Sequence, residues 1–183
     1  YKRQGLADRH LGVGFDQLAV IESGTGDAHL RFFNADGSVS AACGNATRCI
    51  ARYLMDELEK SSLHLTTDRG ALRAEKSSDG FVSINMGKPL LAWQDIPLSE
   101  AMDTLVLPIK GDPSATGMGN PHCTFFVEDI AAIDLEADAA PIEHHPLFPE
   151  RTNVQFAQMI GKDHIRMRVW ERGVGVTLAS GSS

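Results

Sequence analysis

Cysteine is scarce in this chain, which has three cysteines among its 183 residues. This odd number is too small for the disulfide framework of a small secreted protein, so we expect a reducing, cytoplasmic environment. Cys43 and Cys49 lie at a spacing that matches no zinc motif, and the histidines lack companion ligands at metal spacing. We therefore expect no metal site.

Long apolar runs and clustered basic residues are also missing. No apolar segment approaches the roughly 20 residues that span a bilayer, which argues against a membrane protein. The net charge is −7 and the basic residues are scattered, so we expect no nucleic-acid partner. Gly12 and Gly14 are not followed by the third glycine of a dinucleotide-binding fingerprint. With 43% hydrophobic and 22% charged residues, the composition is typical of a soluble globular protein.

The most informative segment present is 31–51, in which Cys43 precedes the first turn of an expected helix. A helix N-terminus concentrates positive partial charge, so it lowers the pKa of a cysteine placed there. Gly44 and Asn45 follow at once and offer backbone donors. Cys43 is therefore a candidate acid, base or nucleophile. The alternative is a buried free cysteine that packs as a small apolar residue.

The chain nearly repeats this pattern close to its C-terminus. Asn34 precedes Cys43 by the same number of residues as Glu171 precedes Ser180, and a glycine-containing loop joins each pair. Either this similarity of short segments is accidental, or the chain holds two related halves. In the second case each half presents a reactive side chain at a helix start, which would suit chemistry on both faces of a substrate.

Apolar alternation and turn signals predict many short strands and few helices. The expected strands are 18–22, 29–33, 62–67, 71–76, 81–85, 104–109, 122–127, 153–159 and 164–170, and the expected helices start at 44 and cover 130–140. This pattern predicts an α+β fold. Glycine and proline cluster in 111–119, so we place a boundary between a half at 1–110 and a half at 111–183. The second half stops in mid-motif at Ser183, and we expect the chain to be truncated at both ends.

Five motifs stand in the order found in the diaminopimelate epimerase family, and the chain resembles that family over essentially its whole length. The motifs are Asn34-Ala-Asp-Gly-Ser38, Ala42-Cys-Gly-Asn45, Gly119-Asn-Pro-His122, Arg151-Thr-Asn153 and Trp170-Glu-Arg-Gly173. The resemblance implies two pseudo-symmetric halves, each a mixed β-sheet wrapped around a central helix. It also implies a cofactor-independent isomerase that interconverts LL- and meso-diaminopimelate in lysine and peptidoglycan-precursor biosynthesis. The resemblance leaves open whether the protein forms a homodimer.

The resemblance assigns roles to individual positions. Cys43 matches one of two catalytic acid/base cysteines, and Ser180 stands at the position of the other. His122 and Glu171 match residues that assist the thiol chemistry. The positions that match substrate-binding residues are Gln17, Asn34, Gly44, Asn45, Asn120, Asn153, Glu171, Arg172, Gly181 and Ser182. The alternative is that the asparagines cap turns and that Glu171 and Arg172 form a surface pair.

Ser180 is the main departure from the family pattern. A serine hydroxyl is much less acidic than a thiol and supplies no resting thiolate, so we expect strongly impaired inversion with retained substrate binding. Two other functions stay open. One is a proline racemase or hydroxyproline dehydratase of the same fold, and the other is a non-catalytic amino-acid-binding relative.

Overall fold

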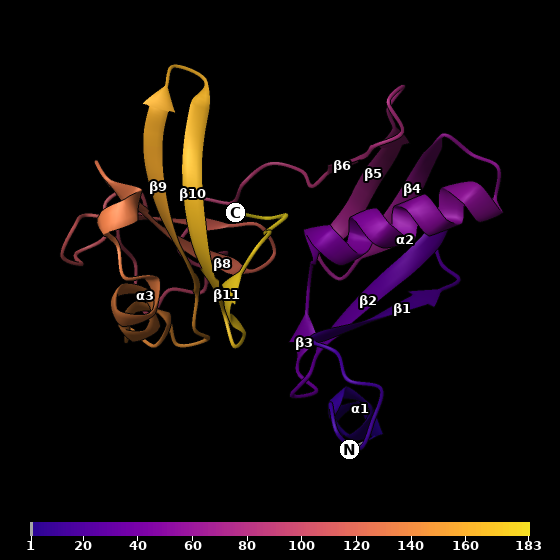
Figure 1. The fold of residues 1–183 in the computed structure, drawn as a ribbon, viewed down its shortest axis with the longest axis horizontal. Coiled ribbons are helices and arrows are strands. Elements are labelled where there is room, and N and C mark those ends of the chain that lie inside the picture. Colours follow the sequence, from indigo (N-terminus) through magenta and orange to yellow (C-terminus); the bar gives the residue numbers. More distant parts are fainter. Residues whose placement is uncertain (1) are drawn as a thin grey trace. The chain divides into compact units, whose positions relative to one another are not determined.

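The computed structural model describes residues 2–183, which form two compact units. The first unit runs to Gly87 and takes in Ser182, and the second runs from Lys88 to Gly181 and takes in Ser183. Each unit contains a mixed β-sheet with a helix packed against it (Figure 1). The predicted α+β fold, with a mixed sheet in each half, is thus confirmed. Within the described residues, no helix is long and apolar enough to cross a membrane.

The first unit begins with α1 (Lys2–Ala7) and continues into a six-stranded sheet. The strands are β1 (Gln17–Glu22), β2 (Ala28–Asn34), β3 (Val39–Ser40), β4 (Ser62–Thr67), β5 (Gly70–Lys76) and β6 (Val82–Asn85). They lie in the order β1-β2-β4-β5-β6, and β3 pairs with β2. β2 and β4 run parallel because the helix α2 (Gly44–Glu57) returns the chain between them.

α2 packs against β4, β5 and β6 (Figure 1). Its buried residues Thr47, Ala51 and Met55 recur at helical spacing and so line one face of the helix. Ala51 and Met55 join a cluster of buried strand residues, which are Ala28, Leu30, Phe32, Leu63, Leu65, Leu72 and Ala74. This apolar contact fixes the start of α2, and with it Cys43, against the sheet.

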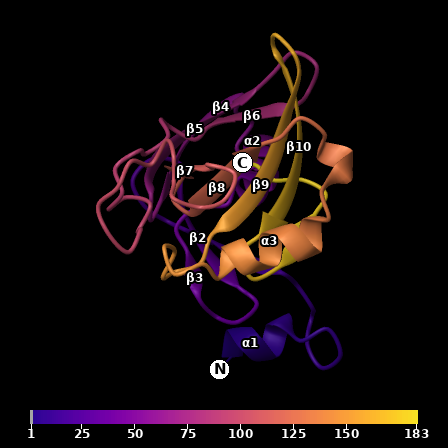
Figure 2. The same ribbon diagram turned by 90° about the vertical axis from the view of Figure 1, so that its left-hand side faces the viewer.

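The second unit forms a five-stranded sheet in the order β11-β10-β9-β8-β7. The strands are β7 (Ser114–Gly117), β8 (Pro121–Phe126), β9 (Asn153–Gly161), β10 (His164–Glu171) and β11 (Gly175–Thr177). β8 and β9 are parallel and are linked by the short 3₁₀ helix η1 (Ile130–Ala132) and by α3 (Leu135–Glu143). α3 packs beside β9 and β10 (Figure 2). The single helix predicted over 130–140 is divided because Asp134 caps α3, its Oδ1 accepting from the Ala137 N–H at 3.1 Å.

The boundary between the units lies at 87/88, earlier than the predicted 110/111. Ile96, Leu98, Leu107 and Ile109 are buried in the apolar cluster of the second unit, so the segment 88–110 belongs there. The other large members of this cluster are Phe125, Ile130, Leu135, Phe148, Val154 and Phe156. The glycine- and proline-rich region that suggested a linker instead contains β7, which pairs with β8.

The strand predicted over 104–109 is wrong, because this segment is a series of bends that pairs with no strand. Leu105 and Val106 are exposed whereas Leu107 is buried, so apolar residues occur here without a sheet to join. The polar groups bond to nearby loops. The Leu107 N–H donates to the Pro113 carbonyl at 2.8 Å, and the Thr104 hydroxyl donates to the Leu91 carbonyl at 2.7 Å.

The two segments that resemble one another in sequence each follow an antiparallel hairpin, β1–β2 and β9–β10. Asn34 and Glu171 are the last residues of the second strand in each hairpin. Gln17 and Asn153 are the first residues of the first strand. Four positions that resemble family binding residues therefore lie at the open ends of two hairpins.

Candidate active site

Cys43 is the N-cap of α2, as the sequence predicts. Its extended backbone (φ −148°, ψ 105°) lets the Sγ accept a hydrogen bond from the Ala46 N–H at 3.4 Å. The Thr47 hydroxyl donates to the Cys43 carbonyl at 2.7 Å and tightens the first turn. Gly44 and Asn45 are the first two helical residues, where backbone N–H groups point out of the helix end. Anionic groups are favoured at such a position.

The Cys43 side chain also has partial apolar surroundings. It is half-buried and packs against the core cluster of the first unit. The structure therefore combines features of both interpretations of Cys43. Its thiol lies at a helix start, and its small side chain contacts the core. Partial burial leaves the thiol within reach of a ligand.

Gln17 and Asn34 lie opposite each other in the first hairpin and are joined by a hydrogen bond. The Gln17 Nε2 donates to the Asn34 Oδ1 at 3.2 Å. The Asn34 Nδ2 in turn donates to the Ser38 hydroxyl at 3.0 Å. Gly37 adopts φ +86°, a left-handed conformation that closes the turn and lets the Gly37 N–H donate to the Asn34 carbonyl. The turn thus fixes the orientation of the Asn34 amide.

His122 is buried, with 1% of its surface exposed, and polar side chains flank both ring nitrogens. The His122 Nε2 lies 2.9 Å from the Asn120 Oδ1, and the Nδ1 lies 2.6 Å from the Gln155 amide. The Gln155 amide pairs donors with acceptors when its oxygen faces the Nδ1 and its nitrogen donates to the Cys123 and Asn153 carbonyls. Both ring nitrogens of His122 therefore have a polar partner. Gln155 was not predicted as a site residue, and Gln158 in the same strand shows that an amide there is not a distinctive signal.

Asn153 links two backbone segments of the second unit. Its side chain is buried, its Nδ2 donates to the Pro121 carbonyl at 2.9 Å, and its Oδ1 accepts from the Arg172 N–H at 3.0 Å. The Arg172 guanidinium donates to the Glu150 carbonyl at 3.0 Å. Glu171 and Arg172 are both half-buried. Asn120, His122, Asn153 and Arg172 are therefore connected at one end of the second sheet.

Ser180 and the residues after it follow β11. Ser180 is half-buried, and its Oγ lies 2.6 Å from the Ser183 Oγ. Gly181 belongs to the second unit, whereas Ser182 is assigned to the first. Both are half-buried. Ser180 thus bonds to a side-chain hydroxyl, whereas the Cys43 Sγ accepts from a backbone N–H in the first turn of α2.

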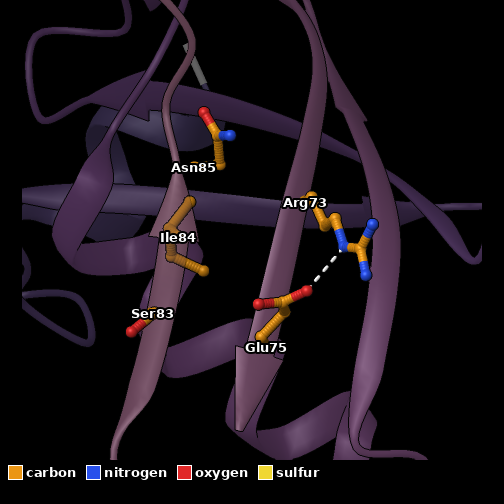
Figure 3. A pocket seen from close by; sticks show the side chains of 5 residues that line it. All are labelled: Arg73, Glu75, Ser83, Ile84 and Asn85. Carbon is orange, nitrogen blue, oxygen red and sulfur yellow. Dashed lines mark ion pairs between the residues drawn. The ribbon is translucent and has the colours of Figure 1, made fainter. Parts of the chain in front are cut away.

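Two pockets of the surface are lined by other residues. One, of about 420 Å³, lies over β5 and β6, where Arg73 and Glu75 form an ion pair at 2.7 Å (Figure 3). Its remaining lining residues are Ser83, Ile84 and Asn85. In the part of the chain that the structure describes, no three His, Cys, Asp or Glu side chains gather as a metal ion would require.

Comparison with known proteins points to one family. A family model described as diaminopimelate epimerase matches residues 2–92 and 114–183. The diaminopimelate epimerase of Acidiphilium cryptum is 50% identical over 97% of this chain, and that of Rhodospirillum centenum is 46% identical over 98%. The chain spans 66% and 64% of the lengths of these two relatives.

Solved structures with low sequence identity share the fold. A Bacillus anthracis phenazine biosynthesis protein of the PhzF family has a TM-score of 0.63 and 16% identity, and the alignment covers 99% of this chain and 66% of that protein. A hydroxyproline epimerase from Agrobacterium vitis has a TM-score of 0.59 and 14% identity, with 96% and 58% of the two chains covered. At these identities the likeness concerns the fold alone.

Proposed function

Because this chain belongs to the diaminopimelate epimerase family, we propose that it acts on diaminopimelate by two-base proton transfer at the α-carbon, without a cofactor. The observation that carries the proposal is Cys43 at the N-cap of α2, beside the backbone of Gly44 and Asn45. A thiol in that position is favoured as a thiolate, because the helix start stabilises negative charge.

The chemistry requires one group on each face of the α-carbon. A thiolate takes the α-proton, the electron pair of the broken C–H bond passes to the α-carboxylate, and a second group returns a proton to the opposite face. Backbone N–H groups at Gly44–Asn45 and Gly181–Ser182 are proposed to stabilise the charge on that carboxylate. The starting thiolate ends protonated, the second group ends deprotonated, and no oxidant is needed.

Ser180 is proposed to occupy the place of the second acid/base group. A serine hydroxyl donates a proton far less readily than a thiol, so inversion should be strongly impaired while the shape of the site is kept. His122 and Glu171 are proposed to assist proton transfer. Gln17, Asn34, Asn120, Asn153 and Arg172 are proposed to bind the amino and carboxylate groups of the substrate, because amides both donate and accept and the guanidinium suits a carboxylate.

Ser180 also favours a second candidate function. A relative that keeps the substrate-binding residues and lacks one acid/base group would bind diaminopimelate without inverting it.

The experiment is α-deuterium incorporation in D₂O, with LL- and meso-diaminopimelate supplied separately to the full-length protein. We expect exchange from one isomer without inversion, because Cys43 serves one face of the α-carbon. Ser180→Cys should raise inversion by about a hundredfold or more. Cys43→Ala should abolish exchange from that isomer, and in the Ser180→Cys protein it should abolish inversion.

The matched control is Cys49→Ser, which changes an exposed thiol on α2 that is remote from the helix start. It should leave exchange unchanged. Tight diaminopimelate binding with no exchange, even after Ser180→Cys, would favour the binding function. Exchange at cyclic imino acids and not at diaminopimelate would refute the proposed substrate.

A further inference from the structure

Glu143 is a buried carboxylate at the last residue of α3, with 4% of its surface exposed. The C-terminal end of a helix carries negative partial charge, so a carboxylate there is electrostatically unfavourable. Removing a carboxylate from water adds a further cost unless hydrogen bonds and opposite charge compensate it. An Arg151 guanidinium nitrogen lies 3.6 Å from the Glu143 carboxylate, and the His144 Nε2 lies 4.0 Å from it.

The two carboxylate oxygens of Glu143 bind the two sides of one turn. The Oε2 accepts from the Trp170 indole Nε1–H at 2.6 Å, and the Oε1 accepts from the Gly173 backbone N–H at 2.8 Å. Glu171 and Arg172 lie between these two donors in the sequence. Hydrogen bonds to an ionised acceptor are among the stronger ones, so Glu143 holds this turn from both sides.

Other bonds hold the same turn from the sheet side. The Arg172 N–H donates to the Asn153 Oδ1, and the Val174 N–H donates to the Glu171 carbonyl at 3.0 Å. Gly173 adopts φ +74°, a conformation that side chains disfavour, so the turn cannot easily be rebuilt with another residue there. Hydrogen bonds thus fix the backbone of Glu171 and Arg172 from two sides, and the Glu143 carboxylate accepts the bonds on one of these sides.

We infer that Glu143 is a positioning residue, which orients Glu171 and Arg172 for binding one charged end of the substrate. The inference rests on the proposed function, because that function gives Glu171 and Arg172 their role. Glu143 acts through the turn and does not touch the substrate. Histidine and glutamate in the segment 143–145 offered no metal-ligand spacing, so the sequence alone provided no reason to select this residue.

The test compares Glu143→Gln with Glu136→Gln. Glutamine keeps the shape of Glu143, and we expect its oxygen to stay on the Gly173 backbone N–H and its N–H₂ group to face the indole N–H, so the bond to Trp170 is lost. We expect the Kd for diaminopimelate to rise about tenfold, with the melting temperature kept within a few degrees. In the Ser180→Cys protein, KM should rise more than kcat falls.

Glu136 is the matched control, because it lies exposed in the first turn of the same helix and its substitution makes the same change in net charge. Its Kd should equal that of the unsubstituted protein. Equal Kd values for Glu143→Gln and Glu136→Gln would overturn the inference. A loss of thermal stability with unchanged affinity would overturn it as well, because it would show a role in folding alone.

A second variant keeps the inference testable if Glu143→Gln does not fold. Trp170→Phe removes the indole N–H and keeps an aromatic ring, and it should raise the Kd in the same direction. The double variant should be less than additive, because both changes remove one shared bond. Additive effects would contradict the shared-bond account.

A measurement without substrate separates this inference from the proposed function. The chain has two tryptophans, so Trp170→Phe assigns the indole N–H resonance of Trp170 by nuclear magnetic resonance. We expect this proton to exchange slowly, and to lose protection in Glu143→Gln. Rapid exchange in the unsubstituted protein would overturn the inference. If the protein does not bind diaminopimelate but the indole proton is protected, the proposed function would be contradicted. The hydrogen bonds from the turn to Glu143 would then still be supported.

Discussion

At the scale of single residues, the three cysteines occupy three different environments. Cys43 is half-buried at a helix start, Cys49 is exposed on α2, and Cys123 is buried within β8. Burial raises the pKa of the Cys123 thiol to about 12, because the thiolate cannot be solvated there. Chemical reactivity should therefore differ among the three, although all carry the same functional group.

We predict that iodoacetamide at about pH 8 alkylates Cys49 and leaves Cys123 unmodified in the folded protein. The thiolate is the nucleophile, and at a pKa of about 12 almost none is present at Cys123. Peptide mass spectrometry measures the labelling. All three cysteines should be labelled in denaturant, which is the control. Equal labelling of Cys123 and Cys49 in the folded protein would contradict the prediction.

At the scale of elements, Asp27 ties the start of β2 to β4. Its carboxylate accepts from the Lys60 ammonium and, at 2.8 Å, from the His64 backbone N–H. The Lys60 bond, followed by the His64 bond, lowers the pKa of Asp27 below its usual value. Strand pairing between β2 and β4 is parallel and covers few residues, so this side-chain link reinforces it.

We predict that Asp27→Asn lowers the free energy of unfolding by about 1 kcal/mol near neutral pH. A carboxyl whose pKa is lowered by folding stabilises the fold above its unfolded pKa of about 3.9, and this stability is lost as pH falls through the folded pKa. The difference between the two proteins should therefore shrink in acid. Urea unfolding at several pH values measures it. Asp163→Asn, in the exposed turn between β9 and β10, is the control, and an equal effect there would refute the assignment.

Several elements could be predicted from the sequence, and the failures have local causes. β1, β2, β9 and β10 were anticipated because alternating apolar residues stand between turn residues. The strand predicted over 104–109 failed because Leu107 and Ile109 are buried by packing in loops, whereas Leu105 and Val106 are exposed. β7 was missed because glycine and proline surround it. Turn composition marks where a chain bends, but it does not mark where a compact unit ends.

At the scale of the whole molecule, the described chain has two apolar clusters that share no residue. One joins α2 to the first sheet and the other joins α3 and the segment 88–110 to the second sheet. Met55 lies in the first cluster with 1% of its surface exposed. A cavity made there removes contacts from the first unit only.

We predict that Met55→Ala lowers the stability of the first unit by about 2–5 kcal/mol. Hydrogen exchange should accelerate at the backbone amides of β4 and β5, while those of β8 and β9 keep their protection. Met159→Ala, at an exposed position of the second sheet, is the control and should change neither set. Equal acceleration in both sheets would show that the two clusters unfold as one.

The sequence by itself determined the features that depend on neighbours along the chain. Cys43 caps α2 because extended residues precede it and a helix-forming segment follows it, and the turn after Asn34 closes because Gly37 tolerates a positive φ. The tertiary structure alone decided the partners of the buried polar groups. Glu143 meets Trp170 and Gly173 only when α3 packs against β10, because hydrogen bonds between distant residues leave no periodic pattern in a sequence.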